Sequence, residues 1–76
     1  MNKQRRDAIQ SILDELQVLR ERIESVRDEE QGAFDNLPDS LQQGSGGQRM
    51  DEAVSALDVA LDGVDEAAAS LDEAQK

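Results

Sequence analysis

The sequence lacks the side chains on which most catalytic and metal sites depend. Among its 76 residues there is no Cys and no His. The absence of Cys excludes disulfides and thiolate metal ligands, and the absence of His removes the commonest general base and the commonest transition-metal ligand. A chain this short also offers little mass for a pocket. We therefore expect a protein that is not an enzyme and that holds neither a metal nor another cofactor.

Aromatic residues and long apolar runs are equally scarce. Phe34 is the only aromatic residue, which excludes base-stacking platforms and aromatic cages. No apolar run approaches the length of a membrane span. The basic stretch 1–6 is not followed by the apolar segment of a signal peptide. These features predict a cytoplasmic protein that does not bind membranes.

The charge is strongly acidic and uneven. The net charge is −10, and residues 31–76 contain only two Lys/Arg against ten Asp/Glu. Such a surface repels phosphate backbones, so direct nucleic-acid binding is not expected. A basic protein surface is the more suitable partner.

The clearest pattern in the chain is a pair of heptad repeats, in which apolar residues alternate at spacings of three and four. The first series is Ile9, Ile12, Leu16, Leu19, Ile23 and Val26, and the second is Met50, Val54, Leu57, Leu61, Val64, Ala68 and Leu71. Each series is typical of a helix that packs along another helix. The sequence therefore predicts an all-α fold, an antiparallel two-helix coiled-coil hairpin in a single domain, 1–76.

The predicted hairpin has a helix at about 3–33, a turn at 34–47 and a helix at about 48–75. In the turn, Asn36 is suited to cap a short helical turn that Pro38 begins, and residues 44–47 are expected to form a flexible Gly-rich link. Phe34, Leu37 and Leu41 are expected to fold back over the open end of the hairpin as an apolar plug.

Charged residues beside the two seams predict how the helices align. Asp51, Asp58, Asp65 and Asp72 repeat along one flank of the second helix, and Arg6, Leu13, Arg20 and Arg27 repeat along the corresponding flank of the first. An antiparallel arrangement then pairs Arg6 with Asp72, Arg20 with Asp58 and Arg27 with Asp51. In this register all the apolar residues of the first seam, Ile12, Leu19 and Val26 included, face the second helix, and the chain turns near residue 40.

A second flank indicates self-association. Ala53, Ala60, Ala67 and Ala74 recur every seven residues beside the second seam, and Leu13 lies outside the strict first seam. Small residues repeated in this way allow another helix to approach closely and widen the apolar stripe. High helix propensity is the alternative explanation of the alanines. We favour a hairpin that dimerises, or forms a larger homo-oligomer, as a four-helix bundle.

The remaining acids form rows on the outer helix faces. They are Asp7, Asp14, Glu21 and Asp28 on the first helix and Glu52, Glu66 and Glu73 on the second. Without His, they do not form the carboxylate–histidine site of a di-metal bundle, and their spacing does not match a calcium loop. Two interpretations stay open: a solvated surface, or a face that binds a basic protein, in its extreme form a nucleic-acid mimic.

Three segments of the chain carry a family resemblance. They are the acidic run DEEQ at 28–31, the turn FDNLPDSLQ at 34–42, and the Ala/Leu/acidic heptads that follow. Together they resemble a group of small acidic helical proteins encoded by bacteriophages, prophages and related mobile elements. The chain departs from that group at residues 44–47, where charged residues are usual. The resemblance implies a helical hairpin in a phage-type accessory context within a bacterial host cell, and no specific activity.

Two functional hypotheses follow. The first is a non-enzymatic phage or mobile-element accessory protein that binds a host or phage protein, for example inhibiting a defence or nucleic-acid enzyme through its acidic face. The alternative is a self-assembling structural coiled-coil protein without a host target.

Overall fold

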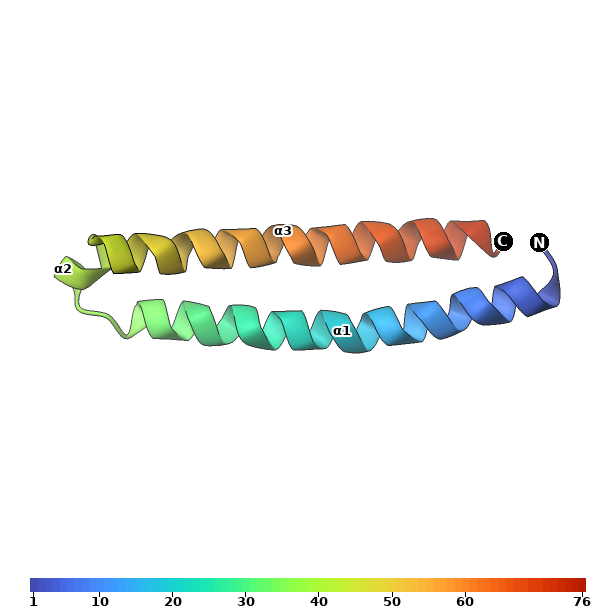
Figure 1. The fold of residues 1–76 in the computed structure, drawn as a ribbon, viewed down its shortest axis with the longest axis horizontal. Coiled ribbons are helices and arrows are strands. Elements are labelled where there is room, and N and C mark those ends of the chain that lie inside the picture. The colour runs from blue at the N-terminus through green and yellow to red at the C-terminus, as the bar shows by residue number, and fades with distance from the viewer.

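The chain folds as a helical hairpin. The computed structural model describes all residues from 1 to 76 and contains three helices, α1 (Lys3–Asp35), α2 (Asp39–Gln42) and α3 (Ser45–Ala74). The two long helices lie antiparallel, with both termini at one end and α2 at the other (Figure 1). The molecule measures 58 × 15 × 12 Å, so it is a rod one helix thick and two helices wide. The predicted all-α antiparallel hairpin is confirmed.

Helix α1 has well-defined ends. Asn2 caps its first turn, since its side-chain oxygen accepts a hydrogen bond from the backbone N–H of Arg5 at 2.8 Å. At the other end the backbone N–H of Asn36 donates to the carbonyl of Gly32 at 3.1 Å, and that of Leu37 donates to the carbonyl of Phe34 at 3.0 Å. Pro38 disfavours helical geometry at the residue before it, so the helix does not continue into the turn. It ends two residues beyond the predicted boundary.

The turn contains the short helix that its sequence predicts, but with a different cap. The N-cap residue of α2 is Pro38, without a side-chain hydrogen bond, whereas Asn36 ends α1. The predicted apolar plug forms only in part, because Phe34 and Leu37 are half-buried while Leu41 remains 56% exposed. A hydrogen bond of 3.0 Å from the Gln42 side chain to the carbonyl of Phe34 fastens α2 to the end of α1.

Helix α3 begins three residues before its predicted start and includes part of the expected flexible link. Gly46 and Gly47 lie in its first turn, and Gly47 is one of only three buried residues in the chain. A Cβ atom on Gly47 would overlap the backbone of Gln42. The prediction of a flexible link is therefore wrong at Gly47, where glycine instead permits close packing between α2 and α3.

The seam between the long helices agrees with the sequence on one side and differs on the other. In α3, Val54 and Leu61 are buried, and the other predicted seam residues are half-buried. In α1, Ile12, Leu19 and Val26 are instead 43%, 44% and 53% exposed. Their places beside α3 are taken by Leu13, Arg20 and Arg27, which are half-buried together with Ile9, Leu16 and Ile23. Helix α1 is therefore rotated about its axis relative to the prediction.

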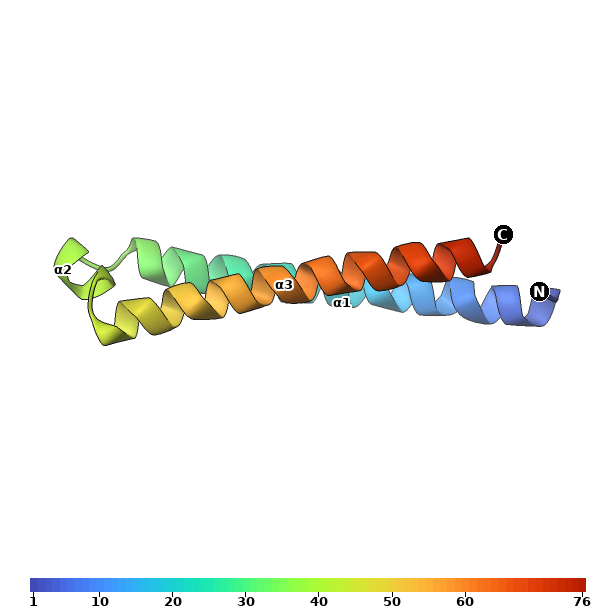
Figure 2. The same cartoon turned by 90° about the horizontal axis from the view of Figure 1, so that it is seen from above.

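The alignment of the helices also differs from the prediction, by one heptad. Arg20 pairs with Asp65 rather than Asp58, and Arg27 pairs with Asp58 rather than Asp51. Arg6, Asp51 and Asp72 form no ion pair. Figure 2 shows the long helices crossing at a shallow angle near the middle of the rod.

The turn explains this shift. Helix α3 extends past the end of α1, and α2 packs against its overhanging first turn (Figure 1). The Asp repeat offers the same carboxylate every seven residues, so a slip of one heptad still gives each Arg a partner. The charge pattern therefore specifies which faces meet but leaves the register to the turn.

Candidate functional site

One broad side of the hairpin is closed by polar contacts between the two long helices. Arg20 Nε lies 2.7 Å from Asp65 Oδ1, and Arg27 Nε lies 2.9 Å from Asp58 Oδ1. Nearer the termini, the Gln75 side chain donates a hydrogen bond of 3.4 Å to that of Gln10. We call this side, defined by Gln10, Arg20, Arg27, Asp58, Asp65 and Gln75, the charged face.

The ion pairs of the charged face shift the pKa values of three groups that form them. The hydrogen bond from Arg20 lowers the pKa of the Asp65 carboxyl below its ordinary value. The same bond, with a second one to Glu24, raises the already high pKa of Arg20, and the bond to Asp58 raises the pKa of Arg27. Because the carboxylates of Asp65 and Asp58 are 52% and 49% exposed, these pairs stabilise the hairpin only weakly and act mainly on which surfaces of the helices face each other.

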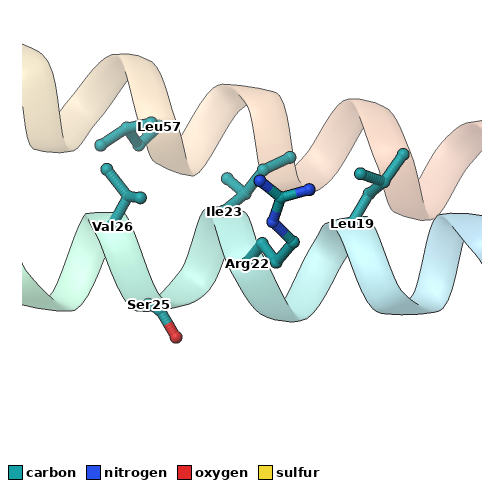
Figure 3. A pocket seen from close by; sticks show the side chains of 6 residues that line it. All are labelled: Leu19, Arg22, Ile23, Ser25, Val26 and Leu57. Carbon is teal, nitrogen blue, oxygen red and sulfur yellow. The ribbon is translucent and has the colours of Figure 1, made fainter.

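The opposite broad side is apolar and uncovered. A groove of about 580 Å³ lies between the helices, lined by Leu19, Arg22, Ile23, Ser25, Val26 and Leu57. Figure 3 shows Leu57 of α3 opposite Val26 and Ile23 of α1, with the Arg22 side chain lying across the groove toward α3. It is the only groove in the structure.

The apolar surface continues along the hairpin beyond this groove. Residues that repeat every seven positions occupy the same side of a helix in a coiled coil. Ile12, Leu19 and Val26 form such a row on α1, and Met50, Leu57, Val64 and Leu71 form one on α3. We call these seven residues the open apolar face.

Two further rows flank the open apolar face. On α3 it is bordered by Ala53, Ala60, Ala67 and Ala74, of which Ala53 is half-buried and the others are exposed. On α1 it is bordered by Glu15, Arg22 and Glu29, all exposed. The predicted position of the alanines beside the apolar stripe thus corresponds to an uncovered surface.

Leu13 does not belong to this surface. It falls on the same heptad row as Arg20 and Arg27 and is half-buried on the side of the charged face. That Leu13 contributes to an oligomer interface stays a prediction, whereas Ile12, Leu19 and Val26, which the sequence places in the hairpin seam, lie on the open apolar face. The rotation of α1 exchanges the two rows.

The acidic row of α1, which consists of Asp7, Asp14, Glu21 and Asp28, is exposed, and its carboxylates contact neighbouring residues of the same helix. Lys3 Nζ lies 2.7 Å from Asp7, and the Gln10 and Gln17 side chains donate hydrogen bonds to Asp14 and Glu21 at 3.1 and 3.4 Å. Arg27 lies 3.4 Å from Asp28. The structure does not join this row to the acids of α3, Glu52, Glu66 and Glu73, of which only Glu73 has a partner, Lys76, at 3.2 Å. The two rows lie on separate outer surfaces.

The sequence reasoning missed the role of two residues. Asp65 was recognised in the Asp repeat without being given a partner, and it forms the shortest ion pair between the helices. Arg22 was not singled out, yet it lies over the groove and makes no ion pair within the chain. Its heptad row, Glu15–Arg22–Glu29, carries alternating charges and was the signal that could have identified it.

The molecule has no grouped metal ligands and no membrane-spanning stretch, and it has no match among known proteins. No three His, Cys, Asp or Glu side chains are grouped so that they could hold a metal ion. Neither long helix contains an apolar stretch sufficient to cross a bilayer. The chain matches no known protein family, no curated protein and no solved structure.

Proposed function

We propose that this chain is a non-enzymatic, self-assembling helical protein whose open apolar face binds a second copy to form a four-helix bundle. The observation that carries the proposal is the uncovered apolar row along the hairpin. Only Val54 and Leu61 are buried apolar residues, whereas Ile12, Leu19 and Val26 point to solvent at regular heptad spacing. A chain of this size rarely gains more than about 3–5 kcal/mol from its own core, and association is a common remedy.

The accessible surface supports the same proposal. The single hairpin exposes 5468 Å². A compact monomer of 8.3 kDa is expected to expose about 4,600 Å². The excess of about 900 Å² is close to the 800 Å² or so that each partner buries in a standard stable interface. We expect a second hairpin on the open apolar face to bury an area of about that size on each partner.

The test compares two exposed valines by sedimentation equilibrium. Val26 of α1 lies on the open apolar face and is 53% exposed, whereas Val59 of α3 lies on the outer row of Glu52, Glu66 and Glu73 and is 70% exposed. We expect wild type and Val59→Asp to sediment as dimers at micromolar concentration, and Val26→Asp to sediment as a monomer with reduced helicity. A folded wild-type monomer at that concentration would overturn the proposal.

A second candidate function uses the outer acids. Asp7 and Asp28 are 65% and 63% exposed, and their row lies away from the open apolar face, so it stays accessible in a bundle. We propose as the second candidate an accessory protein of a phage or mobile element that binds a basic host or phage protein through this row. The resemblance of the turn at 34–42 to small acidic helical proteins of phages and mobile elements supports this phage or mobile-element context.

Charge reversal separates the second candidate from a purely structural role. We expect the variant with Lys at positions 7, 14, 21 and 28 to remain a folded oligomer and to lose competition with DNA for a basic nucleic-acid enzyme. The matched control carries Lys at positions 52, 66 and 73 on α3. Equal competition by wild type and both variants, or none by wild type, would contradict binding through the α1 row.

A further inference from the structure

We infer that the second copy packs antiparallel, with α1 against α1 of the second copy and Leu19 at the two-fold axis. This inference rests on the proposed self-assembly and adds its geometry. The evidence comes from the flanking rows of the open apolar face, the position of Leu19 in α1 and the distribution of charge along the rod.

A two-fold axis allows two ways to place one hairpin on the open apolar face of another. With the axis across the rod, the turn of one copy lies beside the termini of the other, and each helix packs on its own equivalent. With the axis along the rod, the two turns lie together and α1 packs on α3 of the second copy. The two arrangements bring different flanking rows into contact.

The flanking row of α1 favours the antiparallel arrangement. Arg22 lies over the groove without an ionic partner in its own chain, and Glu15 is equally unpaired. Equivalent flanks face each other when two helices pack antiparallel about Leu19, which brings Arg22 next to Glu15 of the second copy, and Glu15 next to its Arg22. The parallel arrangement instead sets Arg22 against the alanine row, which offers no charge.

The apolar row of α1 has the required symmetry. Leu19 is the middle residue of α1, Lys3–Asp35, and Ile12 and Val26 lie one heptad to either side. A two-fold axis at Leu19 therefore places Ile12 on Val26 of the second copy. On α3, the Arg20–Asp65 and Arg27–Asp58 pairs set the same axis near residue 66, between Val64 and Leu71 of its apolar row, where Ala67 permits close approach.

The charge along the rod agrees with this arrangement. The turn end, residues 24–54, carries eight Asp/Glu and two Arg, whereas the terminal end, residues 1–14 and 66–76, carries five Asp/Glu and four Lys/Arg. A parallel dimer would bring two strongly acidic ends together. The antiparallel dimer places that end beside Lys3, Arg5 and Arg6 of the second copy, of which Arg5 and Arg6 have no ionic partner in their own chain.

Cysteine cross-linking tests the arrangement without background, because the chain has no Cys. A disulfide requires Cα atoms within about 7 Å. We expect Leu19→Cys to form a disulfide-linked dimer on mild oxidation. We expect Val26→Cys alone not to do so, since the two copies of position 26 lie 14 residues or about 21 Å apart along the bundle. A mixture of Ile12→Cys and Val26→Cys is expected to give the mixed dimer.

The outcomes separate this inference from the proposed function. If wild type sediments as a dimer but Leu19→Cys does not cross-link, or if Leu19→Cys links to Val64→Cys in preference to itself, the antiparallel arrangement is wrong and self-assembly stands. If wild type is a monomer, both fail.

A charge swap gives a second test that introduces no cysteine. We expect Arg22→Glu to weaken dimerisation at least several-fold at low salt, because it sets glutamates against each other. Adding Glu15→Arg is expected to restore the wild-type dissociation constant. A double variant no tighter than Arg22→Glu would overturn the inferred contact.

Discussion

The charged face and the open apolar face border the same helix seam, yet they carry different kinds of information. The charged face is already paired, with Arg20 on Asp65 and Arg27 on Asp58. The open apolar face has no partner in the chain, and Leu19 and Val26 remain about half exposed on it. The first face is associated with which sides of the two helices meet, and the second leaves apolar side chains uncovered.

The two faces also differ in how many alignments of the helices they allow. The Asp repeat of α3 accepts a slip of one heptad without losing either ion pair, so the charged face tolerates more than one register. The open apolar face is less permissive under the inferred two-fold, because its row on α1 is centred on Leu19 and ends after one heptad in each direction. Substitutions can therefore test the two faces separately.

A substitution in the buried seam between the two long helices is expected to have the largest effect on the free energy of unfolding. Leu61 is 9% exposed and is one of two buried apolar side chains. Leu61→Ala should cost about 2–5 kcal/mol, which is comparable to the whole stability of so small a unit. We expect largely unfolded protein by circular dichroism at 25 °C. Val59→Ala, at a position 70% exposed, is the control and should change the free energy of unfolding by less than about 0.5 kcal/mol.

The turn is the next most sensitive place, because it sets the register of both faces. Gly47→Ala should destabilise by about 1–3 kcal/mol, since its Cβ overlaps the Gln42 backbone. Gly46→Ala meets nothing within 4 Å and should be neutral or stabilising by up to about 1 kcal/mol. Urea denaturation of the two variants measures the difference. Equal stabilities would mean that α2 does not pack against α3 as described.

The sequence predicted the helices well because their signals are local. Heptad spacing in α3 and the absence of Gly and Pro from residues 3–31 define both long helices within a few residues. It also predicted a short helix after Pro38. What failed was long-range: the one-heptad register and the rotation of α1. The register goes with the turn, where Gly47 packs against Gln42, and no repeat in either helix encodes that contact.

The candidate surfaces, like the fold, were predicted from the sequence only in part. The alanine row was placed beside an apolar stripe, and the structure leaves that stripe uncovered. Leu13 was exchanged with the row of Ile12, Leu19 and Val26. These two rows lie on either side of the row of Ile9, Leu16 and Ile23, and a small rotation of the helix decides which of them faces α3. Arg22 was missed although the alternating charges of its heptad row, Glu15–Arg22–Glu29, are visible in the sequence; only its position over the groove needs the structure.

Substitution of the aspartates along the charged face should change stability less, and the order of the effects reports the register of the helices. Asp65→Asn removes an acceptor of Arg20, whereas Asp51→Asn removes a carboxylate with no ionic partner. We expect a lower urea midpoint for Asp65→Asn than for Asp51→Asn. The predicted but unobserved register, in which Asp51 pairs with Arg27, gives the opposite order. The comparison is best made at low salt, because salt screens exposed ion pairs.

The smallest expected effect is the pH dependence of the Arg20–Asp65 pair, and its sign follows from the lowered pKa of Asp65. A carboxyl whose pKa is lower in the folded than in the unfolded state stabilises the fold above its ordinary pKa, about 3.9, and this contribution is lost as the pH falls through the lower folded value. The difference in unfolding free energy between wild type and Asp65→Asn should therefore be constant from pH 7 to about 5 and shrink below pH 4. In an Arg20→Gln background the same comparison should lose this pH dependence, because the hydrogen bond that lowers the pKa is gone. If this pH dependence persists in the Arg20→Gln background, a group other than Arg20 stabilises the charged form of Asp65. The Arg20–Asp65 pair would then not be the contact that joins the helices on the charged face.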